Sequence, residues 1–107
     1  MAFLAGQIPL DRSGALVGPG DLDAQIDQVA ANSIAALSAA GARPDHVVRS
    51  VIYVVSGDVA DLSTARHRLN GSVIGPAFTA ASTLLGVAQL GFPGQLIEVE
   101  LTAALSG

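Results

Sequence analysis

The clearest pattern of apolar and polar positions lies near the C-terminus. Between residues 96 and 103 the side chains alternate, with the apolar residues Ile97, Val99 and Leu101 on one face of a predicted strand. The positions between them hold Glu98, Glu100 and Thr102. Residues 80–88 form a second β-type run, and the Gly- and Pro-rich residues 91–94 separate the two runs with a turn that no helix could pass. The pattern predicts two strands, the second with two carboxylates on one face.

A helix is predicted from Asp21, a preferred N-cap residue, to Gly41, with Pro44 preventing its continuation. Apolar or small side chains recur at three- and four-residue steps, which define its buried face: Leu22, Ile26, Val29, Ser33, Leu37 and Ala40. A helix with this pattern is expected to pack on a sheet.

A second helix is predicted over residues 60–73, before the breaks at Asn70-Gly71 and Gly75-Pro76. Its apolar stripe consists of Leu62, Ala65, Leu69 and Val73. A basic run lies beside the stripe and is expected to be a solvated face, although it could also meet an acidic ligand: Arg66, His67 and Arg68.

The strongest predicted strand is residues 47–55, which are rich in β-branched side chains and apolar at both parities. Such a strand must be covered on both faces, and one layer of helices covers one face only. A further short strand is expected over residues 3–9, ending at Pro9. The predicted order is therefore β-α-β-α-β-β with a hairpin-like end, an α+β fold with two helices packed on one face of the sheet.

Composition predicts one domain, residues 1–107, that associates with other subunits. The chain is 50% hydrophobic and 13% charged, so part of its surface is expected to be covered. Nucleic-acid binding is not expected, because the net charge is −4 and the chain has five Lys plus Arg, three Phe and one Tyr.

The sequence offers little support for a metal site, a cofactor site or a membrane segment. Cysteine is absent, and His46 and His67 are far apart in the sequence without a third ligand at suitable spacing, so we expect no metal and no cofactor. We also expect no signal peptide and no membrane span, because no apolar run reaches the roughly 18–20 residues required. A cytoplasmic location is the default expectation.

Three stretches resemble one known family: residues 3–9 (FLAGQIP), 81–90 (ASTLLGVAQL) and 96–100 (LIEVE). Together they are similar to the reactive-intermediate deaminase family, the RidA or YjgF-type proteins, and the resemblance runs from Phe3 to Ala103. It implies a chorismate-mutase-like fold and a homotrimer with ligand clefts between neighbouring subunits. Deaminating members have a further first strand, with a pocket aromatic, upstream of the point where this sequence starts.

The resemblance also implies a chemistry. Family members hydrolyse imines and enamines: an arginine grips the substrate carboxylate, backbone groups hold the nitrogen end, and a glutamate positions water. Glu98 matches that glutamate, and Gly6, Ser82 and Leu84 fall at substrate-binding positions. Ser82 stands where deaminating members carry the arginine. Loss of such a charged contact costs on the order of 2–5 kcal/mol, so the usual imine deaminase activity is not expected.

Two functional hypotheses follow. The first is a RidA-family trimer that binds or senses a small molecule, or acts on a ligand without a carboxylate. The alternative is a 2-iminobutanoate/2-iminopropanoate-type deaminase, a hydrolase of C=N bonds in which Glu98 positions water and Arg49 or Arg66 grips the acid. A positively charged side chain beside Glu98 and Ser82 would favour the second hypothesis. A trimer with a closed cleft, and Glu98 as a plain surface carboxylate beside Glu100, are the remaining interpretations.

Overall fold

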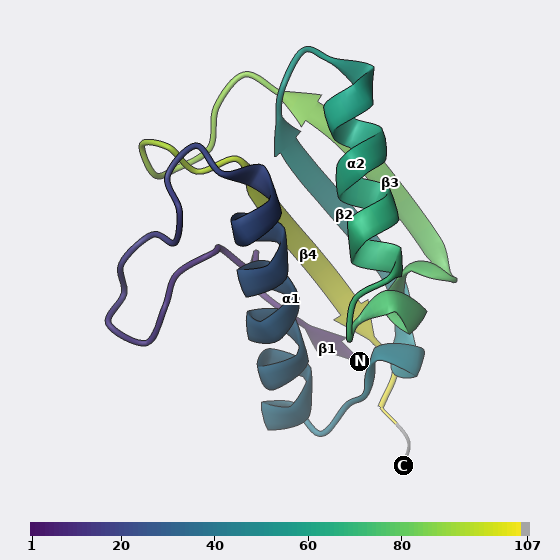
Figure 1. Ribbon diagram of the computed structural model, residues 1–107. Helices are drawn as coiled ribbons and strands as arrows, with labels where there is room; N and C mark the ends of the chain where they lie inside the picture. Colours follow the sequence, from purple (N-terminus) through teal and green to yellow (C-terminus); the bar gives the residue numbers. More distant parts are fainter. Residues whose placement is uncertain (106–107) are drawn as a thin grey trace.

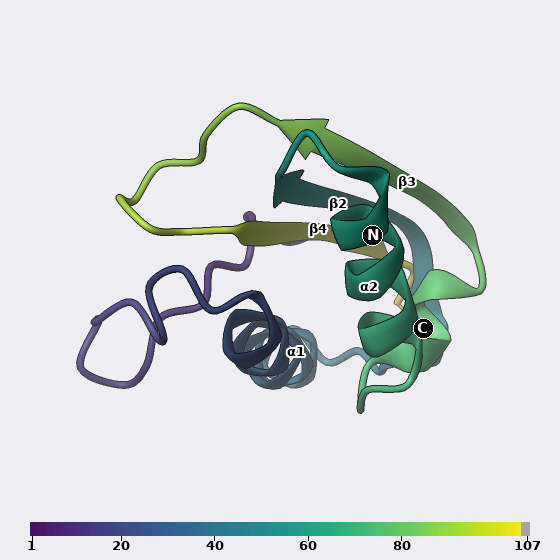
Figure 2. The same cartoon turned by 45° about the horizontal axis from the view of Figure 1, so that its top comes forward.

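The computed structural model describes residues 1–105, which form a four-stranded sheet with both helices on one face (Figure 1). The strand order is β1-β4-β2-β3. The strands are β1 (Ala2–Phe3), β2 (Val47–Val55), β3 (Ala81–Val87) and β4 (Ile97–Ala103), and the helices are α1 (Leu22–Ala39) and α2 (Val59–Asn70). Figure 2 shows α1 and α2 on the same side of the sheet, as the sequence predicted.

Strand β2 lies between β3 and β4, so the expected C-terminal hairpin was wrong. β2 pairs parallel with β3 and antiparallel with β4. The chain crosses from β2 to β3 through α2, and residues 88–96 then pass the end of β2 to start β4 on its other side. The turn residues were recognised correctly, but the strands that they connect find their partner in β2.

Two predicted elements are shorter than expected. The regular part of the first strand is Ala2–Phe3, and backbone pairing with β4 is interrupted before it resumes at Gln7, which exchanges hydrogen bonds of 2.7 and 3.2 Å with Val99. Helix α2 ends at Asn70 with Gly71 as its C-cap. Val73, which was expected on the apolar stripe, is therefore 63% exposed.

The first long helix and the central strand follow the prediction closely. Asp21 caps α1, and its carboxylate accepts a hydrogen bond from the backbone N–H of Ala24 at 3.1 Å. Gly41 has a φ of +79°, the left-handed conformation that favours glycine after a helix. Strand β2 has the predicted bounds of residues 47–55.

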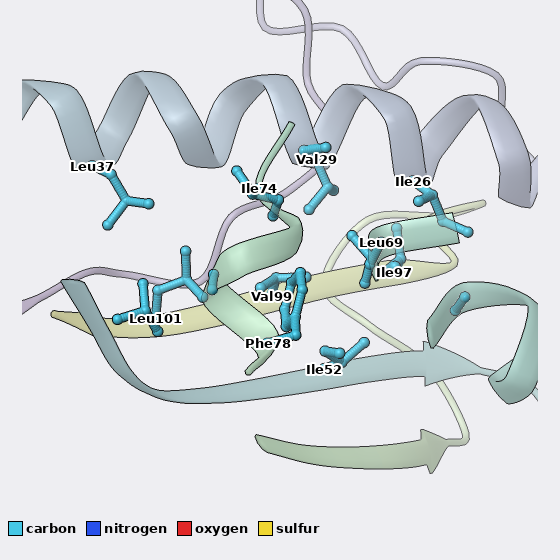
Figure 3. Close-up of a cluster of buried hydrophobic side chains, with 14 of the residues drawn as sticks. Ile26, Val29, Leu37, Ile52, Leu69, Ile74, Phe78, Ile97, Val99 and Leu101 are labelled. Carbon is cyan, nitrogen blue, oxygen red and sulfur yellow. The ribbon is translucent and has the colours of Figure 1, made fainter. Parts of the chain in front are cut away.

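The hydrophobic core lies between the helices and one face of the sheet (Figure 3). Alternate residues of β4 are buried in it, which confirms the two-residue period of this strand. The labelled side chains of the cluster come from α1, α2, β2, β4, and the 3-10 turn at Gly75–Phe78 with the residue before it: Ile26, Val29, Leu37, Ile52, Leu69, Ile74, Phe78, Ile97, Val99 and Leu101. We call the other face of the sheet, which no element of residues 1–105 covers, the open face.

A buried amide fastens the start of β4 to α1. The Gln25 side chain is fully buried, and its Nε2 donates to the carbonyl oxygens of Gly18 at 3.1 Å and Gly94 at 2.8 Å. Its Oε1 accepts from the backbone N–H of Leu96 at 2.7 Å. One side chain therefore satisfies three backbone groups in two loops, a role that the apolar spacing of α1 did not reveal.

We expect Gln25→Ala to destabilise the protein by about 2–3 kcal/mol. The substitution leaves the backbone N–H of Leu96 without its acceptor and removes the hydrogen bonds to Gly18 and Gly94. Chemical denaturation followed by circular dichroism measures the change. Gln89→Ala is the matched control, since Gln89 is exposed in the loop before β4, and should change stability by less than about 0.5 kcal/mol. Equal effects of the two substitutions would contradict the role of Gln25.

Candidate functional site

Gly6 and Glu98, two of the predicted site residues, lie together on the open face of the sheet. Glu98 projects from the interior strand β4, and Gly6 lies where the pairing of the N-terminal segment with β4 is interrupted. A Cβ atom at Gly6 would collide with the Glu98 carboxylate. A side chain at position 6 would therefore displace the Glu98 carboxylate, and glycine lets the main chain lie beside it.

Next to Glu98, a tyrosine and the second glutamate form a hydrogen bond. Tyr53 is opposite Glu98 in the β2–β4 register, and its hydroxyl donates to Oε1 of Glu100 at 2.9 Å. This hydrogen bond, together with desolvation and the negative charges of Glu100 and Glu98, raises the pKa of Tyr53 above its ordinary value of 10.0. The carboxylate of Glu98 contacts instead the Gln95 side chain, whose Nε2 is 3.4 Å from Oε1.

Ser82, which the sequence resemblance placed at the arginine position of deaminating members, lies on the helix-covered face. It is in register with the buried Ser50, whose Oγ donates to Ser82 Oγ at 2.7 Å. Nη1 of Arg66, on α2, donates to the same oxygen at 2.7 Å. The basic run on α2 is therefore a solvated face at His67 and Arg68, which are exposed, and the expectation was wrong for the half-buried Arg66.

The four predicted site residues thus fall into two groups on opposite faces of one sheet. Gly6 and Glu98 are on the open face, and Ser82 and Leu84 are on the helix-covered face, where Leu84 packs against the core. Strand β3, which carries the second pair, is an edge strand. One chain does not bring the two groups into one cleft.

The predicted alternative cation, Arg49, does not complete the site either. It lies on the open face, but it is opposite Thr102, whereas Glu98 is opposite Tyr53. Four residues along β2 correspond to about 13 Å. Neither Arg49 nor Arg66 therefore lies beside Glu98 within one chain.

A hollow in the described surface lies beside the loop before β4. It has a volume of about 530 Å³ and is lined by Val55 and residues 89–96, so it includes none of the four predicted residues. Within residues 1–105 no three potential ligands among His, Cys, Asp and Glu gather as a metal site would require. No helix in the same range is long and apolar enough to cross a membrane.

Comparison with known proteins now identifies the family. The family described as Endoribonuclease L-PSP matches residues 1–105. The chain belongs to this family, whose members include the Rid or YjgF-type proteins. The solved structure of YyfB from Yersinia pestis, a protein of the conserved Rid family, is 40% identical, with 97% of this chain and 77% of that chain covered and a TM-score of 0.84.

Two further relatives agree with this assignment. RidA from Psychrobacter sp. is 25% identical, with a TM-score of 0.77 and coverage of 92% of this chain and 76% of that chain. Protein DfrA from Myxococcus xanthus is 36% identical over 103 residues, 96% of this chain and 73% of its own. The resemblance inferred from the sequence motifs is confirmed at the level of family and fold.

The Tyr53–Glu100 hydrogen bond generates a prediction that one spectrum can check. Tyr53 is the sole tyrosine and the chain has no tryptophan, so phenolate absorbance during an alkaline titration reports on this side chain alone. We expect Glu100→Gln to lower the pKa of Tyr53 toward its ordinary value, because the principal cause of its increase is removed.

Glu98→Gln is the matched control and should lower that pKa less. The hydrogen bond favours protonated Tyr53, so its contribution to stability is complete below the unfolded-state pKa near 10.0 and is lost as the pH rises through the raised folded-state pKa. An unchanged Tyr53 titration in Glu100→Gln would show that the hydrogen bond does not form in solution.

Proposed function

We propose that this Rid-family protein binds a small molecule between neighbouring subunits, with Gly6 and Glu98 from one chain and Ser82 and Leu84 from the next. The observation that supports this proposal is the division of the four residues between opposite faces of the sheet. A second copy that lies along the edge strand β3 is the simplest way to join them.

The composition of the open face supports association of subunits. Leu85 is 44% exposed on β3, where it lies opposite Tyr53, and the half-buried Val55 lies on the same face of β2. Solvent-exposed apolar side chains grouped on one sheet face are typical of subunit interfaces. The proposed assembly is the homotrimer that the family resemblance led us to expect.

A second candidate function is hydrolysis of small imines. In that reaction Glu98 would orient water for attack on the C=N carbon, and the resulting aminoalcohol would release ammonia and leave a carbonyl product. The position of Arg66 favours this candidate. Its guanidinium contacts Ser82, an uncharged residue of β3, and so places a positive charge beside that strand.

Ribonuclease activity, which the family description names, is not proposed. Binding of RNA depends on cationic side chains that displace counterions from phosphates, and the chain has a net charge of −4. Two of its five basic side chains, Arg43 and Arg68, form ion pairs with aspartates. The surface charge therefore favours a small ligand over a polyanion.

The two candidates separate in an assay of ammonia release from 2-iminobutanoate generated in situ. We expect the unmodified protein to stay near the spontaneous rate. The double variant Arg66→Gln/Ser82→Arg, which moves the guanidinium from the helix to the strand, should exceed it by at least about tenfold, since a bidentate arginine on the strand would orient the substrate carboxylate beside Glu98. That gain should disappear when Glu98→Ala is added, whereas Glu100→Ala, on the same face of the same strand, should keep it.

Hydrolysis by the unmodified protein that Glu98→Ala abolishes and Glu100→Ala spares would establish the second candidate instead. Light scattering gives an independent check on the assembly. A monomer at micromolar concentration would contradict a ligand site shared between subunits.

A further inference from the structure

The hydroxyl groups around Arg66 form a cluster that has hydrogen-bond donors to spare. Ser82 Oγ accepts one hydrogen bond from Ser50 Oγ and one from Arg66 Nη1, each 2.7 Å long. The contact between the two hydroxyls uses one hydroxyl proton, so the Ser50–Ser82 pair has a second proton that this contact does not use. The guanidinium has five N–H donors, of which Ser82 takes one.

The charge of Arg66 also has no partner among residues 1–105, where the ion pairs of arginine side chains involve Arg43 and Arg68. Side chains three and four positions from Arg66 on α2 are uncharged: Leu62, Ser63, Leu69 and Asn70. A half-buried guanidinium without a carboxylate partner loses solvation and gains no ion pair in return.

Arg68, two residues along the same helix, shows what a structural arginine does in this fold. Its guanidinium binds both oxygens of Asp27 on α1, with distances of 2.8 and 2.7 Å. The pair ties the two helices together and holds the pKa of Asp27 below its usual range. Arg66 forms no comparable ion pair within the described residues. A role in holding the helices together therefore does not explain why an arginine lies there.

We propose that Arg66, oriented through Ser82 and Ser50, is the anion-recognition residue of the ligand site and that the ligand carries a carboxylate. This inference rests on the intersubunit site proposed above and names the class of its ligand. The planar guanidinium has donors left for a bidentate contact with two carboxylate oxygens. It replaces the expectation of a ligand without a carboxylate.

The elements around Arg66 hold it in place. Ala65 and Leu69, on the same helix, are fully buried in the core, so α2 cannot rotate to withdraw the side chain. Ser50 is 1% exposed and fixes the hydroxyl of Ser82 from the neighbouring strand. Deaminating relatives are expected to carry a positive charge on the strand. In this chain α2 supplies the charge, because the Arg66 guanidinium contacts the Ser82 hydroxyl.

The experiment compares an acid with its neutral analogue by NMR titration of the full-length, ¹⁵N-labelled protein. The probes are 2-oxobutanoate and 2-oxobutanamide, which differ in the carboxylate. We expect the acid to shift the backbone amide signals of Ser50, Ser82, Gly6 and Glu98, and the amide to bind at least about tenfold more weakly, as loss of a charge-assisted hydrogen bond requires.

Arg66→Gln should weaken binding of the acid by about 10- to 100-fold and remove the preference for acid over amide. Arg66→Lys keeps the charge without the planar fork and should give an intermediate loss. Arg68→Gln is the matched control, because it removes a guanidinium from the same helix and should leave the acid preference unchanged. The double variant Arg66→Gln/Ser82→Arg should recover tight binding of the acid.

Equal affinity of the unmodified protein and a folded Arg66→Gln for the acid would overturn the assignment, as would equal affinity for acid and amide. Shifts at Gly6 and Glu98 that do not depend on Arg66 would overturn the role of Arg66 and preserve the proposed ligand site. Shifts confined to Ser50 and Ser82 that depend on Arg66 would preserve the role of Arg66 and overturn the ligand site shared with Gly6 and Glu98. Absence of shifts at all four residues would overturn both proposals.

Discussion

The register of the central strand is the constraint on which the candidate site depends. Successive side chains of a strand point to opposite faces, and the pairing of β2 with β3 and β4 assigns every residue to one face or the other. Ser82 lies beside the buried Ser50, and Glu98 lies beside Tyr53 on the open face. No rotamer change moves a side chain through a sheet, so the two pairs of predicted site residues cannot meet within a single chain.

The contact with Arg66 changes the interpretation of Ser82, the residue that the resemblance placed at the arginine position of deaminating members. From the sequence, Ser82 indicates loss of a positive charge, and with it loss of carboxylate recognition. In the folded chain the hydroxyl of Ser82 contacts a guanidinium that comes from α2, sixteen residues earlier. The charge beside a strand position therefore depends on side chains from other elements as well as on the residue at that position. Here Arg66 of α2 supplies it beside β3.

Polar side chains in this fold differ in how fully partners within the chain satisfy them. Gln25 and the Arg68–Asp27 pair hold loops and helices in place, and each uses its polar atoms on partners within the chain. Glu98 and Arg66 have oxygen or nitrogen atoms left without such partners in residues 1–105. Polar groups with unused hydrogen-bonding capacity at a sheet face and a sheet edge are typical of positions where a ligand or a second subunit binds.

Local patterns in the sequence were sufficient to predict α1, β2 and the alternation of β4, because caps, helical spacing and two-residue alternation each act over a few residues. The motifs also identified the family. Tertiary structure decided the features that depend on distant residues: β4 pairs with β2 and not with β3, Gly6 lies against Glu98, and Arg66 reaches Ser82. These contacts join segments whose separation in the sequence carries no periodic signal, so only the folded chain determines them.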